Sequence, residues 1–519
     1  MTRPAVVWDE SHQARTLALN VGGRYATLAI ELLLGLVMLP FNTRYLGASD
    51  YGLWMLAASI VAYFPALDLG YGGAMERFVA HYRARRDAGA INEIASTLAF
   101  VFAALGLVAF VIAGGIAWNL GTMFGLAPAQ ARTGGIVLAL VAAQISMGLP
   151  FSVFGAVVNG FQRTYLNSVV GTVAALAVAA VNVGVLMGGG DLVTLVAATT
   201  ATRIISYGAY RLNAYRVYPL LRIRPSLFRK ARLREVTGFS VYVLIHDASN
   251  KINYASDPIV IAAVLSTGAV AVWTIAQRLA ELVLRLTNQL GLVLFPIVVD
   301  CDSAQRHDRL KELLVHGTRL SLATVLPAAG ALALMADEVV VGWTGTEFAA
   351  AAAVLEILAL VVVVRVGGWT ASTVLLGGGH IRLVSLSNLI GSMTNVELSI
   401  VLVLTHRLPG VAVATLIPAS SRAAAILLPL SCARVGISIR QFLMTAVWPA
   451  AWPAAVVLLA LAMAPPPPAS LLQVFLRGIV VAFTYALLFA GVAIGRKDRG
   501  RYVGKLKSVA GWPALSAAA

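Results

Sequence analysis

The sequence predicts an all-α, polytopic membrane protein with about 14 transmembrane helices, arranged as two six-helix lobes and two C-terminal helices. The chain has 519 residues, of which 59% are hydrophobic and 12% charged. Soluble domains are roughly 45–50% apolar and about 25% charged. Most of the chain falls into apolar runs near the ~20 residues that a membrane-spanning helix needs. Lys and Arg gather in every second gap between these runs, a pattern typical of membrane proteins with many spans.

Each apolar run is long enough to cross a bilayer, and the stretches between them are too short for a folded soluble domain. The predicted spans cover approximately 17–41, 51–75, 91–118, 133–158, 166–188, 192–213, 236–265, 270–298, 313–335, 350–376, 383–405, 411–432, 442–464 and 470–494.

The distribution of positive charge predicts the orientation of the chain. With the N-terminus inside, the cytoplasmic gaps hold 27 Lys and Arg, and the outer gaps hold only Arg44, Arg132 and Arg407. This asymmetry predicts that both termini are cytoplasmic. It also explains the net charge of +16 by contact with the lipid bilayer, so nucleic acid is not an expected partner.

The longest basic gap predicts a boundary between two halves. We expect an N-terminal lobe at 1–213, a basic cytoplasmic linker at 214–235, a C-terminal lobe at 236–432, and helices 13 and 14 with a basic tail at 433–519. The turns Leu46–Trp54 and Leu265–Trp273 each place Leu and Trp eight residues apart. They occupy equivalent positions in the two halves, as a parallel internal repeat requires.

Polar residues form a stripe on the first predicted helix. Asn20, Arg24, Thr27 and Glu31 follow one another at spacings of 4, 3 and 4 residues, which places them on one helical face. In the eighth helix Arg278, Glu281 and Arg285 do the same. Ionisable residues in a bilayer usually face the bundle interior. A water-filled cavity between the lobes is therefore expected.

The sign of these charges favours an anionic substrate. Arginine binds phosphate through paired hydrogen bonds, so Arg24, Arg278 and Arg285 are predicted to contact a lipid-linked diphosphate. Asn20, on the same stripe as Arg24, is also predicted to contact the substrate. The alternative for helix 8 is an intrahelical ion triad in which Glu281 neutralises its neighbours.

The seventh helix adds polar and acidic candidates. Asn250, Asn253 and Asp257 share a face, with Asp247 beside it, and the two asparagines are predicted to contact substrate. A carboxylate in a low-dielectric cavity can bind a coupling proton or cation, which makes Asp247, Asp257, Glu31 and Glu281 coupling candidates. Each could equally be the partner of a nearby Arg or Lys.

The sequence contains no motif for catalysis, metal binding or nucleotide binding. GxxxxGK[ST], HExxH, GxSxG and zinc-ligand spacings do not occur. Cys301 and Cys432 are the two cysteines and imply no disulfide framework. We therefore expect a transporter with no catalytic residue, metal or cofactor.

Three segments carry a family resemblance, namely Arg44–Trp54, Leu67–Gly72 followed by Arg77–Ala80, and Ser256–Ile261 followed by Val272–Leu279. They resemble the polysaccharide flippases of the Wzx type, in the multidrug/oligosaccharidyl-lipid/polysaccharide exporter superfamily. The resemblance implies translocation of an undecaprenyl-diphosphate-linked glycan across the inner membrane by alternating access, for cell-surface polysaccharide such as lipopolysaccharide. Polysaccharide polymerases and glycosyltransferases are the implied protein partners.

The resemblance also assigns residues. Cavity-lining arginines stand in helices 1, 2 and 8 of related lipid II flippases, and Arg24 and Arg278 match two of them by helix. Helix 2 has no arginine in its core here, and helices 13 and 14 exceed the usual twelve. The alternatives are a drug/cation antiporter of the same superfamily, which the arginines disfavour, and an integral glycosyltransferase or ligase, which the short outer loops disfavour.

The predicted orientation can be tested by labelling from outside the cell. In a chain whose Cys301 and Cys432 are replaced by Ser, a cysteine placed at Ser49 or Thr346 should react with an impermeant maleimide. A cysteine at Ser226 should not react, because the linker is predicted to be cytoplasmic. Labelling at Ser226 in intact cells would reverse the topology.

Overall fold

A computed structural model describes residues 13–64, 71–237, 241–464 and 470–493. These residues are almost entirely helical and include no strand, and ten segments within them are long and apolar enough to cross a membrane. Large apolar side chains such as Val111, Leu404 and Phe475 are more than 60% exposed, a surface suited to lipid contact. The chain is a multi-pass helical membrane protein, as the sequence predicts.

The ten segments and two further helices match the predicted spans. Gly22–Val61 and Ile381–Arg434 each contain helices from two predicted spans. The helices α9 (Val241–Val264) and α10 (Thr267–Ser303) correspond to predicted spans seven and eight.

Two long helices contain sharp breaks. In α1 (Gln13–Val61) the break is at Gly47, with φ 73° and ψ 172°, a conformation that glycine adopts without a Cβ penalty. In α14 (Ile381–Arg422) it is at Arg407, with φ 51° and ψ −136°. The span predicted at 51–75 is not one continuous helix, because α1 ends at Val61 and the next helix begins at Tyr71.

The chain divides into two compact units. The first contains residues 1–274 and 388–411, and the second contains 275–387 and 412–519. The predicted lobe and linker boundaries are a different division and stay a prediction.

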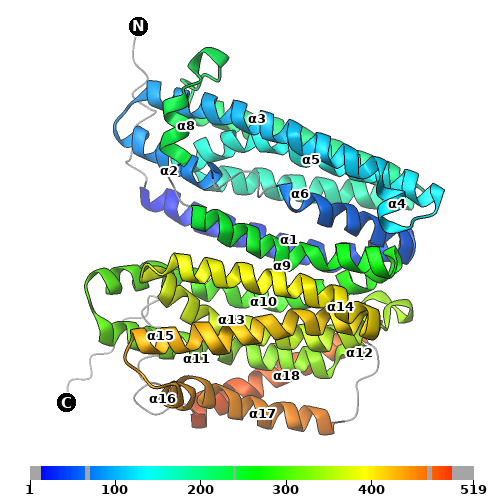
Figure 1. Ribbon diagram of the computed structural model, residues 1–519, viewed down its shortest axis with the longest axis vertical. Helices are drawn as coiled ribbons and strands as arrows, with labels where there is room; N and C mark the ends of the chain where they lie inside the picture. Colours follow the sequence, from blue (N-terminus) through cyan, green and yellow to red (C-terminus); the bar gives the residue numbers. More distant parts are fainter. Residues whose placement is uncertain (1–12, 65–70, 238–240, 465–469, 494–519) are drawn as a thin grey trace. The chain divides into compact units, whose positions relative to one another are not determined.

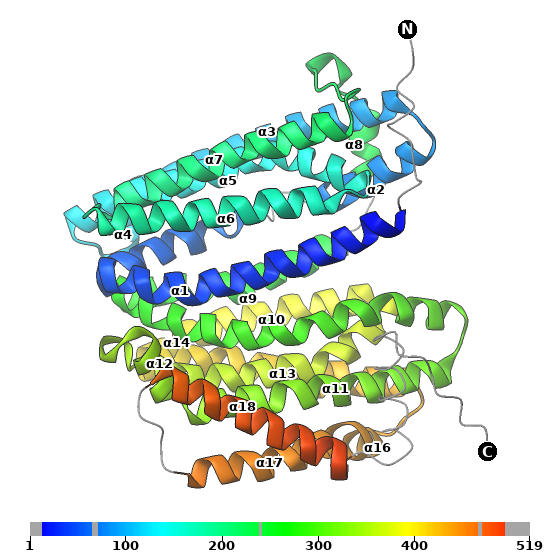
Figure 2. The same cartoon turned by 180° about the vertical axis from the view of Figure 1, so that it is seen from behind.

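The first unit is built around packed long helices, and Figures 1 and 2 show α3 and α5 side by side with α7 against α5. Besides α1, α9 and part of α14, its helices are α2 (Tyr71–Ala84), α3 (Ala88–Trp118), α4 (Leu120–Phe124), α5 (Pro128–Gly160), α6 (Thr164–Met187), α7 (Leu192–Val217), η3 (Pro225–Leu227) and α8 (Lys230–Thr237).

The second unit holds the rest of α10 and α14 with the C-terminal helices. These are α11 (His307–Leu334), α12 (Ala336–Thr344), η4 (Thr346–Phe348), α13 (Ala351–Gly377), η5 (Ala423–Leu427), α15 (Leu428–Arg434), α16 (Ile439–Phe442), η6 (Leu443–Val447), α17 (Trp448–Met463), α18 (Leu471–Leu488) and η7 (Phe489–Ala493).

Each unit has an apolar core at the helix ends predicted to be cytoplasmic. In the first, Met75, Ile91 and Phe102 from α2 and α3 are fully buried. In the second, Leu314 of α11 and Cys432 of α15 are almost fully buried in one cluster. The polar helix ends beside these cores are capped. The Asp87 carboxylate, for example, accepts a hydrogen bond from the Ala90 amide at 2.9 Å, the usual arrangement at a helix N-terminus.

The two similar turns in the sequence meet within the first unit. A Cβ on Gly52 would overlap the carbonyl oxygen of Thr267 and lie 3.2 Å from the Ala271 amide nitrogen. If Leu46 is aligned with Leu265, Gly52 is aligned with Ala271. The two turns therefore touch through equivalent positions, which is how elements related by a two-fold axis meet.

Gly52→Ala should disrupt this contact. The added methyl group has no room beside Thr267, and overpacking costs about 1–3 kcal/mol. Gly35→Ala is the control, because a Cβ there meets nothing within 4 Å, and alanine is favoured over glycine in a helix by up to ~1 kcal/mol. Thermal unfolding in detergent should give a lower midpoint for Gly52→Ala only. Equal midpoints would mean that the turns do not pack this closely.

Candidate functional site

The polar stripe on α1 is divided between packing and exposure. The Asn20 amide nitrogen donates to the Gln162 carbonyl at 2.8 Å, and its oxygen accepts from the Tyr165 amide at 2.9 Å. The Thr27 hydroxyl lies 2.8 Å from that of Thr172. Asn20 and Thr27 thus attach α1 to the start and body of α6. The predicted contact of Asn20 with substrate stays a prediction.

The two charged members of the stripe are exposed. Arg24 and Glu31 form no ion pair with each other or with another described residue. Glu31 lies within electrostatic reach of the Tyr210 hydroxyl on α7, as does Arg203. Asn20 and Thr27 therefore hold α1 against α6, whereas Arg24 and Glu31 on the same stripe are exposed.

The polar face of α9 packs against an equally polar face of α14. The Asn388 side chain donates to Asn250 at 2.9 Å. The Asn253 amide donates to the Ser392 hydroxyl at 2.8 Å, and that hydroxyl donates to the Ser249 carbonyl at 2.9 Å. Asn250 and Asn253, predicted to bind substrate, thus have a role in joining two helices. Their contact with substrate stays a prediction.

Asp257 continues the same contact one turn further along. Its side chain is only 4% exposed, and its Oδ1 accepts hydrogen bonds from Asn395 at 3.4 Å and Ser399 at 3.3 Å. Both bonds are long for a carboxylate. Asp247, the other acidic candidate on α9, has a side chain outside the described part of the structure.

The α14 face is a feature that the sequence analysis missed. Asn388, Ser392, Asn395 and Ser399 repeat at 4, 3 and 4 residues, the spacing already noted on α1. The stripes predicted from the sequence lie on helices with several charged residues, whereas the face of α14 that contacts α9 carries uncharged polar residues. A search for amide and hydroxyl side chains at helical spacing would have found it.

On α10, Glu281 lies between the two predicted arginines. Its Oε2 is 3.4 Å from Arg278 Nη1 and 3.6 Å from Arg285 Nη2, and its Oε1 accepts from Gln277 at 3.1 Å. The side chains of Arg278 and Arg285 remain 51% and 46% exposed, against 20% for Glu281. The intrahelical ion triad therefore forms. One carboxylate serves two guanidinium groups, so the triad keeps a net positive charge.

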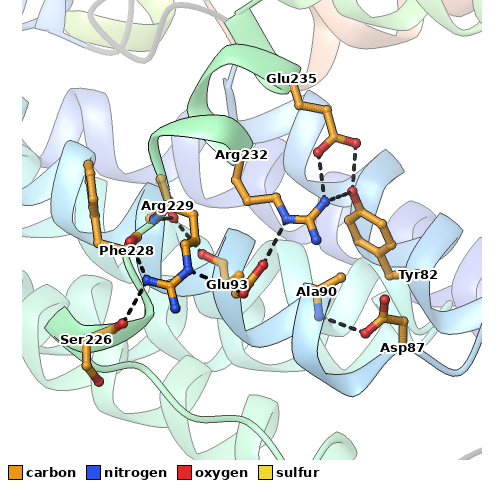
Figure 3. A network of polar contacts seen from close by, with 10 residues as sticks. Tyr82, Asp87, Ala90, Glu93, Ser226, Phe228, Arg229, Arg232 and Glu235 are labelled. Atoms are coloured by element: carbon orange, nitrogen blue, oxygen red, sulfur yellow. Dashed lines mark hydrogen bonds and ion pairs between the residues drawn. The ribbon is translucent and has the colours of Figure 1, made fainter.

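The basic linker is fixed to the first unit by an ion-pair network (Figure 3). Arg232 on α8 contacts Glu93 of α3 and Glu235, each at 3.1 Å. The Tyr82 hydroxyl of α2 accepts from Arg232 at 2.8 Å and donates to Glu235 at 2.6 Å. Arg229 adds a second contact to Glu93 at 3.5 Å. We call these five residues the linker clamp.

Uncharged side chains of α3 hold the linker backbone beside this clamp. Asn92 bonds the Leu220 carbonyl and the Arg222 amide at 3.0 and 2.9 Å. Ser96 bonds the carbonyl of Arg222 and the amide of Arg224. Asn92, Glu93 and Ser96 lie on one face of α3, so one helical face binds both the backbone and the charges of the linker. Sequence analysis assigned none of them a role.

The clamp sets the ionisation of its members. Burial and the hydrogen bond to Glu235 raise the pKa of Tyr82 to about 12. Burial alone would raise the pKa of Glu235, but hydrogen bonds from Tyr82 and Arg232 outweigh it and hold that pKa below 4.5. At neutral pH the clamp therefore contains a neutral phenol and charged ion pairs.

Comparisons with known proteins agree with this architecture. The family described as polysaccharide biosynthesis protein matches residues 25–301. The structure is similar to the lipid II flippase MurJ in its inward closed conformation, at 14% identity and a TM-score of 0.69, covering 91% of this chain and 98% of that one. No curated protein sequence matches.

Two transporter structures also share the fold. An inward-facing multidrug resistance MATE family transporter of the MOP superfamily is 15% identical with a TM-score of 0.66, covering 79% of this chain and 94% of that one. A MOP superfamily transporter from Pyrococcus furiosus Vc1, described as having a binding pocket of reverse polarity, is 14% identical with a TM-score of 0.56, covering 84% and 98%. At these identities the likeness concerns the fold alone.

Arg232→Ala should weaken attachment of the linker. We expect a loss of about 1–2 kcal/mol, because charge-assisted hydrogen bonds are lost at partly exposed side chains. Arg234→Ala is the control, because Arg234 lies two residues away, is exposed and has no ion pair among the described residues. Thermal unfolding should separate the two variants at pH 7.

The pH dependence of this difference follows from Glu235. Its folded pKa lies below the ordinary value of 4.5, so its stabilisation is complete above about pH 4.5 and disappears as the pH falls through the folded pKa. The gap between wild type and Arg232→Ala should be constant from pH 7 to pH 5 and should narrow on further acidification. A gap that widens at low pH would contradict the assigned ion pair.

Proposed function

The chain belongs to the polysaccharide biosynthesis protein family, and on this premise we propose that it translocates an undecaprenyl-diphosphate-linked oligosaccharide across the plasma membrane by alternating access. The fold is that of MOP superfamily transporters and flippases. In the proposed orientation both termini are cytoplasmic, and the chain acts as a transporter and catalyses no covalent step. Polysaccharide polymerases and glycosyltransferases would act before and after it on the same glycan.

The observation that carries the proposal is exposed positive charge on membrane-spanning helices. Arg24 on α1 and Arg278 and Arg285 on α10 are exposed although they lie within predicted spans. A guanidinium group left in hydrocarbon costs roughly 2.5–3.5 kcal/mol on insertion scales. A polar cavity that receives a diphosphate would offset that cost, because diphosphate oxygens accept paired hydrogen bonds from arginine.

The carboxylates provide candidates for energy coupling. Glu31 lies seven residues from Arg24 on the same stripe, and Glu281 bridges Arg278 and Arg285. Protonation of Glu281 would break its ion pairs with Arg278 and Arg285, so that both arginines could bind the diphosphate. Deprotonation of Glu281 would restore the ion pairs and displace the diphosphate. Asp257, buried between α9 and α14, is a further candidate, and Asp247 stays a candidate from its sequence position.

A drug/cation antiporter is the second candidate, because a MATE family transporter shares the fold. Such a transporter would use acidic groups to bind its cargo. The net positive charge of the α10 triad favours the anionic lipid instead. Ethidium, a cationic dye, therefore serves as the competing substrate in the experiment below.

Reconstituted transport tests the proposal. Vesicles containing the protein should move a fluorescent undecaprenyl-diphosphate-linked sugar between leaflets and should not transport ethidium. Arg24→Ala and Arg278→Ala should each slow this movement at least about tenfold, since a charge-assisted hydrogen bond contributes ~1.5–3 kcal/mol. Arg234→Ala, on the linker, should retain the wild-type rate.

An imposed pH or sodium gradient extends the same assay. If Glu31 or Glu281 couples transport, the gradient should accelerate wild type but not the corresponding Glu→Gln variant. Wild-type rates in both Arg→Ala variants would remove these arginines from the site, and ethidium transport would favour the antiporter. A wild-type rate unaffected by either gradient would leave the two glutamates as partners of the arginines only.

A further inference from the structure

A second pair of arginines lies in the second unit, outside the stripes on α1, α9 and α10. Arg365 is near the middle of α13, and Arg422 is the last residue of α14, directly before the π-helical turn η5. Both fall well inside predicted spans, at 350–376 and 411–432. Cations at this depth need compensation from the protein or from a ligand.

The packing of α13 on η5 brings the two arginines together. A Cβ on Gly368 would lie 3.5 Å from Leu427 and 3.7 Å from Ala423, so glycine allows the helix to approach η5 closely. Arg365 is one turn before Gly368 on the same face of α13, and Arg422 immediately precedes Ala423. The neighbouring charge that acts on Arg422 is accordingly Arg365, a second cation.

Arg422 lacks the compensation that other arginines of this unit have. Arg319 donates from Nε and Nη2 to the Thr445 carbonyl at 2.9 and 2.5 Å, and Arg434 forms an ion pair with Asp302 at 2.8 Å. The half-buried Arg422 donates from Nε to the Ser387 hydroxyl at 3.4 Å, and it forms no ion pair within the described residues. A guanidinium group has five N–H donors, so most of its donor capacity is available.

We propose that Arg365 and Arg422 bind a carboxylate of the transported glycan, which makes the substrate an acidic oligosaccharide. This inference rests on the proposed function. A carboxylate between two guanidinium groups reduces their mutual repulsion and accepts paired hydrogen bonds from arginine. The diphosphate is assigned to Arg24 and the α10 arginines, so a second anionic group must come from the sugars. The adjacent π-helical turn is of a kind frequently found at functional sites.

Binding of a free acidic sugar tests the site without transport. The full-length protein in nanodiscs of zwitterionic lipid is unfolded thermally in increasing sodium glucuronate, with glucose and sodium chloride at matched ionic strength as controls. The wild-type midpoint should rise and saturate with glucuronate only. Arg365→Gln and Arg422→Gln should need at least tenfold more glucuronate, and Arg422→Lys should retain part of the response. Arg440→Gln, an exposed arginine of the same unit, should behave as wild type.

The stability of the ligand-free variants separates binding from a packing role. The glucuronate response of each variant is therefore measured as a shift from its own ligand-free midpoint. An unchanged glucuronate response in both variants, or an equal response of wild type to chloride or inorganic phosphate, would overturn the carboxylate site. If Arg422→Gln does not fold, Arg422→Lys and Arg365→Gln provide the same comparison.

Transport of two lipids separates this inference from the proposed function. Wild type should move undecaprenyl-diphosphate carrying a neutral disaccharide or one ending in glucuronate. Arg422→Gln should move the neutral lipid normally and the acidic lipid at least tenfold more slowly. Equal slowing of both would overturn the acidic-sugar assignment. If wild type moves neither lipid, the proposed flippase function fails, and the inference that rests on it fails too. The glucuronate titration still decides whether Arg365 and Arg422 form an anion site.

Discussion

The cost of an unpaired polar group in hydrocarbon governs this structure. Within a bilayer, a backbone or side-chain dipole without a partner costs several kcal/mol, so polar residues persist in spans where another helix or a ligand satisfies them. The α9–α14 contact follows this rule. Asn250, Asn253 and Asp257 would make α9 a poor membrane helix alone, and α14 presents amides and hydroxyls at matching intervals. The polar residues disfavour each helix alone in the membrane, but their mutual hydrogen bonds fix the alignment of α9 against α14.

The same rule separates residues that build the protein from residues available to a ligand. Asn20 and Thr27 are satisfied by α6, whereas Arg24 and Glu31 on the same stripe are exposed. Arg319 is satisfied by a backbone carbonyl, whereas Arg422 has one long bond to a serine. Arg319 and Arg422 are the same residue type and both lie within predicted spans. What differs is the partner, and groups left with donor capacity are the ones that can contribute to substrate binding.

The fold could be predicted from the sequence because span length and charge asymmetry are local properties. The stripe on α10 and its ion triad could also be predicted, because all three residues lie within eight positions of one helix. Contacts between residues distant in sequence could not be predicted in this way. The face of α3 that holds the linker, from Asn92 to Ser96, looks like an ordinary polar helix start until Arg222 and Arg232 are placed against it. The role of Asn388 likewise depends on α9, 138 residues earlier. Periodicity identifies a polar face, but it does not say whether a helix or a ligand covers it.

The dependence of α9 on α14 has a consequence for biogenesis. The hydrogen-bond partners of Asn253 and Asp257 lie 138 to 142 residues later in the chain. At a synthesis rate of about 5–20 residues per second, those partners emerge roughly 7–30 seconds after α9 does. During that interval Asn253 and Asp257 are without their α14 partners, although α1 and α4, which precede α9 in the chain, can already contact it. The α9–α14 contact therefore forms late, after α10 to α13 have been synthesised.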